Sequence, residues 1–359
     1  MAKRIKMTDV ARMAGVSTAV VSAVLNGRKG GSIRVSDDTR QRINLAAKEL
    51  GYVADPLAVS LAGGRRNLIG VFTYEALFPV EHRDFYHPFL VGIEEEAERC
   101  GYDLVLFTRT RDAAGRRRVF RDGVNHLRLA DGAILLGADP DRDELERLLE
   151  EDFPFVYVGR RTSRLDRMSY SAADYVSATA EMVEYLVNKG HRELAMLTTG
   201  EDNESSLDRD QGFALGIARH ELALRKIAIP AAAVTLDTVR DLLKAGVTAF
   251  VVARDDRARA VLRATDSLGL RAGRDFSLAV LGNDLLADDA PRPHWTHFDV
   301  PRQEMGAAAV RLLVERIQTP EEQAPRRVVL PCRLIAGDTV GPVPPRQFAD
   351  LARNSARLT

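Results

Sequence analysis

The side chains best placed for chemistry lie within residues 7–26, in two short apolar patterns separated by a glycine. The first pattern predicts a helix whose small apolar face consists of Val10, Ala11 and Ala14. Gly15 then provides a turn where a Cβ would clash, and the hydroxyl of Ser17 can cap a second helix. The buried stripe of that second helix is formed by Val20, Val21, Val24 and Leu25. Its opposite side presents short side chains to a groove, as expected of a helix-turn-helix whose second helix enters the DNA major groove: Thr18, Ala19, Ser22, Ala23 and Asn26.

The charge distribution supports contact with phosphates. The whole chain is neutral, but residues 1–66 carry a net charge of +7 and residues 67–359 a net charge of −7. A basic segment on an acidic body is the electrostatic pattern of a protein that binds nucleic acid. Arg28 and Lys29 lie in a flexible basic loop after the second helix. The alternative reading is a solvated basic tail, which does not account for the ordered helical pattern.

Length and composition narrow the class of protein. With 359 residues, of which 45% are hydrophobic, the chain suits two or three packed domains. No apolar run follows the basic N-terminus as in a secretory signal, and no stretch approaches the ~20 apolar residues that span a bilayer. Cys100 and Cys332 form neither a disulfide framework nor a CxxC motif. We therefore expect a cytoplasmic protein without a membrane partner, a metal or another cofactor.

A third helix and a linker follow the first two helices. Ser36 is expected to cap the third helix and Gly51 to end it, and its packing stripe is formed by Ile43, Ala46, Ala47 and Leu50. Within the linker, Asp55-Pro56 can begin a short helix that Gly63 ends. Because so short a helix is marginal in water, we expect it to form only against DNA or a partner subunit.

From Leu68 onward, strands alternate with helices. The first series predicts strands at 68–73, 102–108, 132–136 and 155–158, with helices at 85–100, 116–129 and 143–151. The second series predicts helices at 176–189, 208–220, 256–268 and 303–318, with strands at 194–198, 249–253 and 276–281. This alternation predicts an α/β fold with two doubly wound parallel subdomains behind a small all-α headpiece. A ligand would lie outside the carboxyl ends of the strands, between the two lobes.

Together these features resemble the LacI/GalR family of bacterial transcription regulators. The headpiece carries the most specific match, in residues 8–17 and 21–27, and residues 34–36 and 50–52 match the third helix. Weaker matches follow in the right order: 58–61 for the hinge helix, 190–192 before a strand, 209–213 for an Arg-x-x-Gly-aromatic motif, and 295–306 for a segment crossing between lobes.

The resemblance implies a domain order and a set of partners. The expected domains are a headpiece (1–53), a hinge (54–66), a two-lobed effector-binding and dimerisation domain of the periplasmic binding protein type (67–345), and a flexible tail (346–359). The implied partners are double-stranded DNA with a palindromic operator, a second copy of the chain, and a sugar-like small molecule. Met7, Thr8 and Ala58 fall at DNA-contacting positions, and Leu61 would wedge into the central base step of the minor groove. The alternative for Leu61 is an ordinary linker leucine.

The recognition helix departs from the family. Positions 18 and 19 commonly read base edges, and an arginine often follows Ser22, whereas this chain has Thr18, Ala19 and Ala23. Alanine cannot make the bidentate contact that arginine makes to guanine. We therefore expect a half-site that differs at that base, with Ser17, Ser22 and Asn26 touching phosphates.

The expected effector site also departs from relatives that bind neutral sugars. Where those have asparagine then aspartate, this chain has Arg254-Asp255, and the next strand leads to Asn283. With Arg209 from the shared motif, two arginines could face the cleft and favour a sugar acid or sugar phosphate. The alternative is that Arg254 pairs with Asp255 or Asp256, or lies outside the cleft.

Aromatic side chains near the expected cleft could form a sugar-binding wall. Tyr74, Phe85, Tyr86 and Phe89 lie after the first strand or at the start of its helix, and each could equally belong to the core. Phe89, in a Pro-Phe pair, best resembles a wall residue.

The sequence contains no convincing catalytic motif. The pair His294 and His297 is poorly spaced for a metal on an extended segment, and an enzyme is not expected. The remaining alternatives are a regulator whose pocket has decayed and a solute-binding protein without a DNA role.

Overall fold

The computed structural model describes residues 5–25, 35–52, 66–76, 83–161, 166–198, 200–283, 293–321 and 324–344. Contacts divide the chain into two compact units. The first comprises Met1–Leu68 with Leu129–Asp131, and the second comprises Ile69–Arg128 with Gly132–Thr359.

The first unit contains a headpiece of three helices: α1 (Met7–Ala14), α2 (Thr18–Leu25) and α3 (Asp37–Leu50). Gly15 ends α1 in the left-handed conformation, with φ 66°, as the sequence predicts. Ser36 caps α3 by accepting the N–H of Thr39, and Gly51 ends α3 with φ 64°. The buried core is formed by Val10, Ala11, Ala14, Val21, Val24, Ile43, Ala46 and Ala47. The helix-turn-helix and its third helix are therefore confirmed.

The N-terminal lobe of the second unit is built on one six-stranded sheet. Its strands, in spatial order, are β13 (Arg327–Leu330), β7 (Tyr170–Ala173), β6 (Phe155–Val158), β5 (Gly132–Leu136), β1 (Leu68–Thr73) and β2 (Asp103–Leu106). The pairs from β13 through β1 are all parallel. The helices of this lobe are α5 (Arg83–Arg99), α6 (Arg142–Glu150) and α11 (Arg302–Gln318).

The C-terminal lobe repeats the plan. Its sheet has the order β14 (Arg333–Ile335), β12 (Thr296–Asp299), β11 (Ser277–Val280), β10 (Ala249–Val252), β8 (Leu194–Thr198) and β9 (Lys226–Ala228). Only the edge strand β14 pairs antiparallel among the pairings of this sheet. Its helices are α7 (Tyr175–Asn188), α8 (Glu204–Arg219), α9 (Leu236–Lys244) and α10 (Asp255–Asp266). The predicted pair of parallel α/β subdomains is confirmed.

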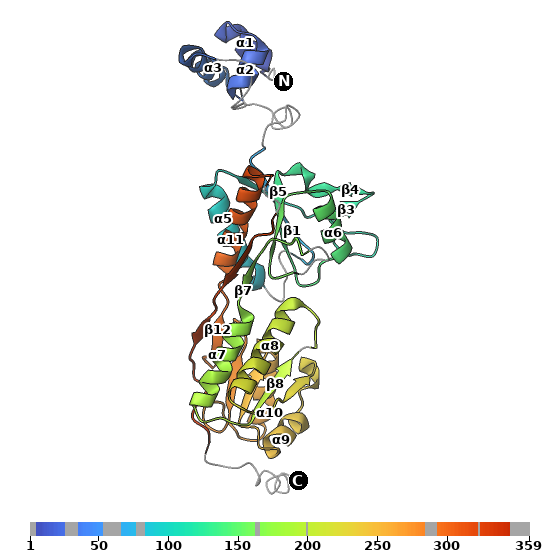
Figure 1. Cartoon of the computed structure of the whole chain (residues 1–359), viewed down its shortest axis with the longest axis vertical. Coiled ribbons are helices and arrows are strands. Elements are labelled where there is room, and N and C mark those ends of the chain that lie inside the picture. The colour runs from blue at the N-terminus through green and yellow to red at the C-terminus, as the bar shows by residue number, and fades with distance from the viewer. Residues whose placement is uncertain are drawn as a thin grey trace. The chain divides into compact units, whose positions relative to one another are not determined.

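The chain passes between the lobes at three points, after β7, after β12 and after β13. The second crossing brings α11 back beside α5 in the N-terminal lobe (Figure 1). These two helices meet backbone to backbone, because a Cβ at Gly92 would strike the carbonyl of Gln303 and one at Gly306 would strike that of Phe89.

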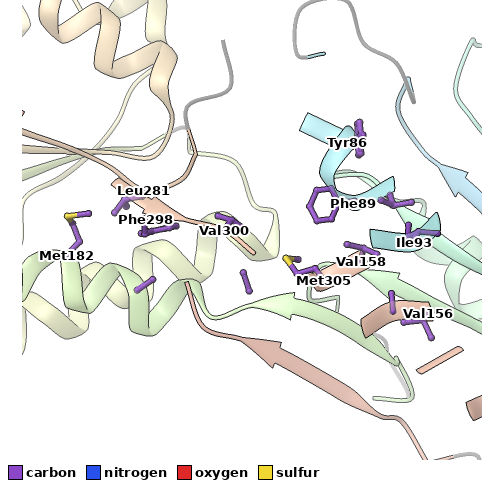
Figure 2. Close-up of a cluster of buried hydrophobic side chains, with 14 of the residues drawn as sticks. Tyr86, Phe89, Ile93, Val156, Val158, Met182, Leu281, Phe298, Val300 and Met305 are labelled. Atoms are coloured by element: carbon purple, nitrogen blue, oxygen red, sulfur yellow. The ribbon is translucent and has the colours of Figure 1, made fainter. Parts of the chain in front are cut away.

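One buried apolar cluster extends through both lobes. Figure 2 shows Ile93, Val156 and Met305 on the side of the N-terminal lobe, and Met182 and Phe298 on the side of the C-terminal lobe. The lobes are thus joined by packed side chains as well as by crossing strands.

The helix predicted at 116–129 is wrong. The structure has a hairpin there, β3 (Phe120–Arg121) with β4 (Val124–Asn125), followed by the 3₁₀ turn η1 (His126–Leu129). Asp122 and Gly123 form the two-residue turn, with φ of 50° and 76°. An Asp-Gly pair is a strong hairpin signal, and it overrides the helical spacing of the apolar residues.

Candidate DNA-binding surface and effector cavity

The side of α2 that the sequence predicts to face DNA is accessible in the headpiece. Thr18 and Ala19 are exposed and Ser22 and Ala23 are half-buried. Neither alanine carries a hydrogen-bond donor, so each offers only apolar contact to a base.

The other residues predicted to contact DNA differ in solvent exposure. Ser17 and Thr8 are exposed, and the Oγ of Ser17 accepts the N–H of Val20 at 3.4 Å. Met7 is half-buried and packs against the core of the three helices. The other expected DNA contacts lie outside the described residues and stay predictions: Asn26, Arg28, Lys29, Ala58 and Leu61.

A cavity of about 310 Å³ lies between the two lobes, which we call the interlobe cavity. Its polar walls follow the carboxyl ends of strands from both sheets, at Glu75 after β1, Arg254 after β10 and Asn283 after β11. This is the position where parallel α/β sheets bind ligands, and the volume suits a small one.

Arg209 of α8 is held rigidly at this cavity. Its Nε donates to the carbonyl of Leu281 and its Nη1 to that of Ser205, both at 2.8 Å. Its guanidinium carbon lies 3.9 Å from the ring centroid of Tyr175. Burial raises the pKa of Tyr175, so its phenol stays neutral beside the arginine. The predicted cleft position of Arg209 is where the structure places it.

Arg254 and Asp255 both line the cavity at the start of α10. The Nε of Arg254 lies 3.8 Å from a carboxylate oxygen of Asp256, and its side chain is 45% exposed. The structure thus combines the two alternatives, since Arg254 faces the cavity and also has an acidic neighbour. Asp255 is buried.

Asn283 fixes the crossing segment beside the cavity. Its Oδ1 accepts the N–H of Val300 at 3.2 Å, and its Nδ2 donates to Asp299. The amide therefore connects the end of β11 to the chain that leads into α11.

Three aromatic residues of α5 line the interlobe cavity: Phe85, Tyr86 and Phe89. Phe85 packs edge-on against Tyr86 at 4.8 Å and against Phe89 at 6.0 Å between ring centroids. Tyr74 is not brought to this cavity. Its ring packs against Phe72 and lines a different hollow on the N-terminal lobe.

Sequence reasoning missed several lining residues. Tyr175 and Arg302 follow the unpredicted strands β7 and β12, and Arg302 donates to the carbonyl of Phe85 at 3.0 Å. The polar remainder comes from the turn before α8, from the first turn of α8 and from the end of β1: Glu201, Asn203, Ser205, Ser206 and Glu75. Recognition of β7 as a strand would have placed Tyr175 at its carboxyl end.

The described lining is balanced in charge. Three arginines (Arg209, Arg254, Arg302) face three carboxylates (Glu75, Glu201, Asp255). Such alternation offers both donors and acceptors to a polyhydroxylated ligand.

Two ion pairs join the lobes next to the cavity. Arg160, after β6, donates to both carboxylate oxygens of Asp208 on α8, at 3.0 and 2.5 Å. The neighbouring Arg161 lies 3.4 Å from Glu204 at the start of α8, and both of these side chains are buried. These contacts hold the two walls of the cavity together.

In the described part of the chain, no three His, Cys, Asp or Glu residues are grouped so as to hold a metal ion. None of its single helices has the length and apolarity to cross a bilayer, and the pair α1 and α2, which does together, is bent by 103°.

Two family models match the chain. Residues 6–55 match the model of bacterial regulatory proteins of the lacI family, and residues 183–340 match the periplasmic binding protein-like domain. The matched segments contain the helix-turn-helix and most of the C-terminal lobe. They define a DNA-binding regulator with a ligand-binding body of the periplasmic type.

Individual transcriptional regulators are similar to the chain over nearly its whole length. The chain is 28% identical to the HTH-type transcriptional regulator CelR of Thermobifida fusca, over 94% of this chain and 98% of CelR. It is 27% identical to the maltose regulon regulatory protein MalI of Escherichia coli K12, over 93% and 98% of the two chains. The chain thus carries the DNA-binding domain of the lacI family of bacterial regulatory proteins, and it matches these two regulators along nearly their whole length.

Solved structures show the same fold. A complex of the transcriptional regulator CelR with cellobiose matches with a TM-score of 0.60 and 27% identity, over 94% of this chain and all of that chain. The lac repressor dimer bound to operator and the anti-inducer ONPF matches with a TM-score of 0.68 and 24% identity, over the same shares.

Proposed function

We propose that this regulator is a cytoplasmic homodimer that represses genes of carbohydrate use and that a neutral sugar in the interlobe cavity changes its affinity for a palindromic operator. The observation that carries the sugar assignment is the lining, in which aromatic rings stand beside balanced arginines and carboxylates. Rings pack on the apolar face of a sugar, and the charged groups bind its hydroxyls. The structural similarity to CelR, solved with cellobiose, supports the same class of ligand.

From the sequence, Arg209 and Arg254 suggest an anionic sugar, beside the alternative that Arg254 is paired with an aspartate or lies outside the cleft. Three carboxylates in the same lining weigh against that choice. Arg254 also has Asp256 as a neighbour, and Arg209 is already bonded to two backbone carbonyls. A neutral ligand therefore needs no further charge compensation.

The proposed mechanism follows from the two-lobed architecture. A sugar that contacts both lobes stabilises one angle between them over others, because a ligand shifts a conformational equilibrium toward the state it binds more tightly. That angle would set the spacing of the two headpieces of a dimer, and so their fit to an operator. No catalytic step is assigned to the protein.

Calorimetry on the full-length protein tests the ligand class. Cellobiose, maltose and glucose are compared with glucuronate, using Arg209→Lys as the site variant and Arg219→Lys, exposed on the same helix, as its control. A neutral sugar should bind the wild type and the Arg219 variant equally and the Arg209 variant more weakly. Binding of glucuronate alone would contradict the neutral ligand, and no response to any sugar would favour a decayed pocket.

Operator binding tests the regulatory half of the proposal. A palindrome upstream of the protein's own gene is titrated with and without the sugar, and across half-site variants with wild type and Ala23→Arg. We expect the arginine to create a preference for one base pair of roughly 1–3 kcal/mol. An unchanged base preference would show that Ala23 does not face the bases, and the absence of DNA binding would favour a solute-binding protein.

A further inference from the structure

A second cavity, of about 640 Å³, lies on the N-terminal lobe beside the carboxyl ends of β1 and β5. Its walls are the end of β1, the start of α6 and a small hairpin of residues 110–118, which we call the arginine hairpin. The cavity itself, lined by five arginines in all, we call the arginine cavity. Its described lining shares Glu75 and Ala76 with that of the interlobe cavity. The two cavities are therefore neighbours with different walls.

The arginine hairpin is ordered by its own backbone. Arg118 donates to the carbonyl of Thr110 and Asp112 to that of Arg116, both at 2.8 Å. The carboxylate of Asp112 accepts two backbone N–H groups across the turn, and Gly115 closes the turn with φ 78°. These bonds order the backbone from which the hairpin arginines extend.

Two arginines face each other across this hairpin. Arg111 and Arg117 form an antiparallel bridge pair, so their side chains leave the hairpin on the same face. Like charges directly opposite are destabilising. Burial, and then the charge of Arg111, lower the pKa of Arg117.

Arg117 also lacks an acceptor. Its Nε and Nη1 are buried and donate to no atom within the described residues. The hydroxyl of Tyr74, in the same lining, is buried and unpartnered in the same way. Buried donors without acceptors cost stability, and here both belong to residues that line one cavity, which favours binding of an acceptor there.

The described lining also contains four carboxylates, those of Glu75, Asp139, Asp141 and Asp143, against its five arginines. Asp141, Glu75 and the adjacent Asp112 are engaged elsewhere. Asp141 pairs with Arg118 and caps α6 by accepting the N–H groups of Asp143 and Glu144. Asp112 lies 3.2 Å from Arg118 and 3.4 Å from Arg116. Glu75 accepts the hydroxyl of Tyr86 and the N–H of Ala138. These groups satisfy Arg118 and Arg116 and leave Arg117 without a carboxylate.

We propose that the arginine cavity binds the phosphate group of a small phosphorylated metabolite, with Arg111 and Arg117 as its cations and the Tyr74 hydroxyl as a neutral donor. Donors from two different elements suit an anion with several oxygens, and guanidinium groups bind phosphate through paired N–H bonds. A cavity of about 640 Å³ accommodates a sugar-sized body behind the phosphate. This second ligand is distinct from the neutral sugar of the interlobe cavity, and the shared wall at Glu75 puts the two sites in contact.

Calorimetry and thermal shift on the full-length protein test the site, with inorganic phosphate and glucose 6-phosphate as probes and acetate as a monocarboxylate. Arg117→Gln should weaken phosphate binding roughly tenfold or more, and Tyr74→Phe about threefold. The control is Arg274→Gln, an exposed arginine paired with Asp275 in the C-terminal lobe, which should bind phosphate like the wild type. The basic headpiece is common to all variants, so its own affinity for phosphate does not distinguish them.

Three results would overturn the site. These are equal phosphate binding by wild type and Arg117→Gln, acetate binding as tightly as phosphate, or no phosphate binding at about 10 mM. If Arg117→Gln does not fold, Arg111→Gln tests the same pair from its exposed member. The neutral-sugar response should survive in these variants, so failure of this site and failure of the proposed effector are separate results.

Discussion

The described linings of the two cavities of the effector domain contain three and five arginines, whose hydrogen-bond partners differ. In the interlobe cavity, Arg209 and Arg302 donate to backbone carbonyls and Arg254 lies near Asp256. In the arginine cavity, Arg117 has buried donors without acceptors and faces another arginine. The difference shows that the number of arginines in a cavity does not by itself indicate the charge of its ligand. The deciding property is whether the N–H groups of those arginines already have acceptors within the protein.

The largest expected effect is at the interlobe cavity, where Arg209→Ala should weaken carbohydrate binding about 100-fold, or roughly 3 kcal/mol. The substitution removes the stack on Tyr175 and both bonds to the backbone carbonyls. Calorimetry would measure it, with Arg219→Ala as the control. A loss below threefold would show that the arginine is structural and does not contact the sugar.

A matched pair of tyrosines compares the cavities directly. Tyr86→Phe removes a bond to the carboxylate of Glu75 and should lower the free energy of unfolding by about 2 kcal/mol. Tyr74→Phe removes an unpartnered buried hydroxyl, so its free energy of unfolding should stay the same or rise by about 1 kcal/mol. Urea unfolding would measure both. Equal losses would mean that Tyr74 has an acceptor in solution.

The ion pair between the lobes tests whether each cavity depends on their relative position. A double-mutant cycle of Arg160→Ala and Asp208→Asn should give a coupling of about 1 kcal/mol in unfolding, since the pair is partly exposed. Asp208→Asn should weaken sugar binding a few-fold and leave phosphate binding unchanged. A parallel loss of both ligands would show that the arginine cavity is not confined to one lobe.

The smallest effect concerns pH. Burial lowers the pKa of His191, whose ring bonds Thr248, Ser277 and the Gly341 carbonyl in the C-terminal lobe. Because the folded state prefers the neutral imidazole, its contribution to stability is present above the ordinary pKa of about 6.5 and is lost as the pH falls below it. His191→Gln should therefore flatten the acid side of the urea midpoint against pH. The affinities for the neutral sugar and for phosphate, measured at about pH 7.5, should not change in this variant.

Much of this architecture could be predicted from the sequence, because local signals agree with the fold. Strands 68–73, 132–136, 155–158 and 194–198 have the predicted bounds, since each is a mostly buried apolar run. The caps of the headpiece were equally local: Gly15, Ser36 and Gly51 act through their own backbone or hydroxyl. Arg209 and Asn283 were placed at the cavity by family resemblance and not by pattern.

The remainder depends on contacts that no local pattern contains. Strands β7, β12 and β13 are short and form at the crossings, where pairing with distant strands decides their conformation. Tyr74 illustrates the limit at the site. It follows β1 as a cavity residue should, but its ring turns to Phe72 and away from the cleft. The domain limits at 53 and 66 and the tail after 345 stay predictions.

The backbone contact between α5 and α11 has a consequence for biosynthesis. The lobe that is translated first cannot be completed until residues 302–330 have emerged, because α11 and β13 belong to it. Most of the other lobe, from α7 to β12, is one continuous stretch and needs from downstream only the edge strand β14 and the short segment 336–343 that follows it. Domains generally fold as units during synthesis. The C-terminal lobe can therefore fold before the N-terminal lobe, in which α5 has no partner helix until α11 has been synthesised.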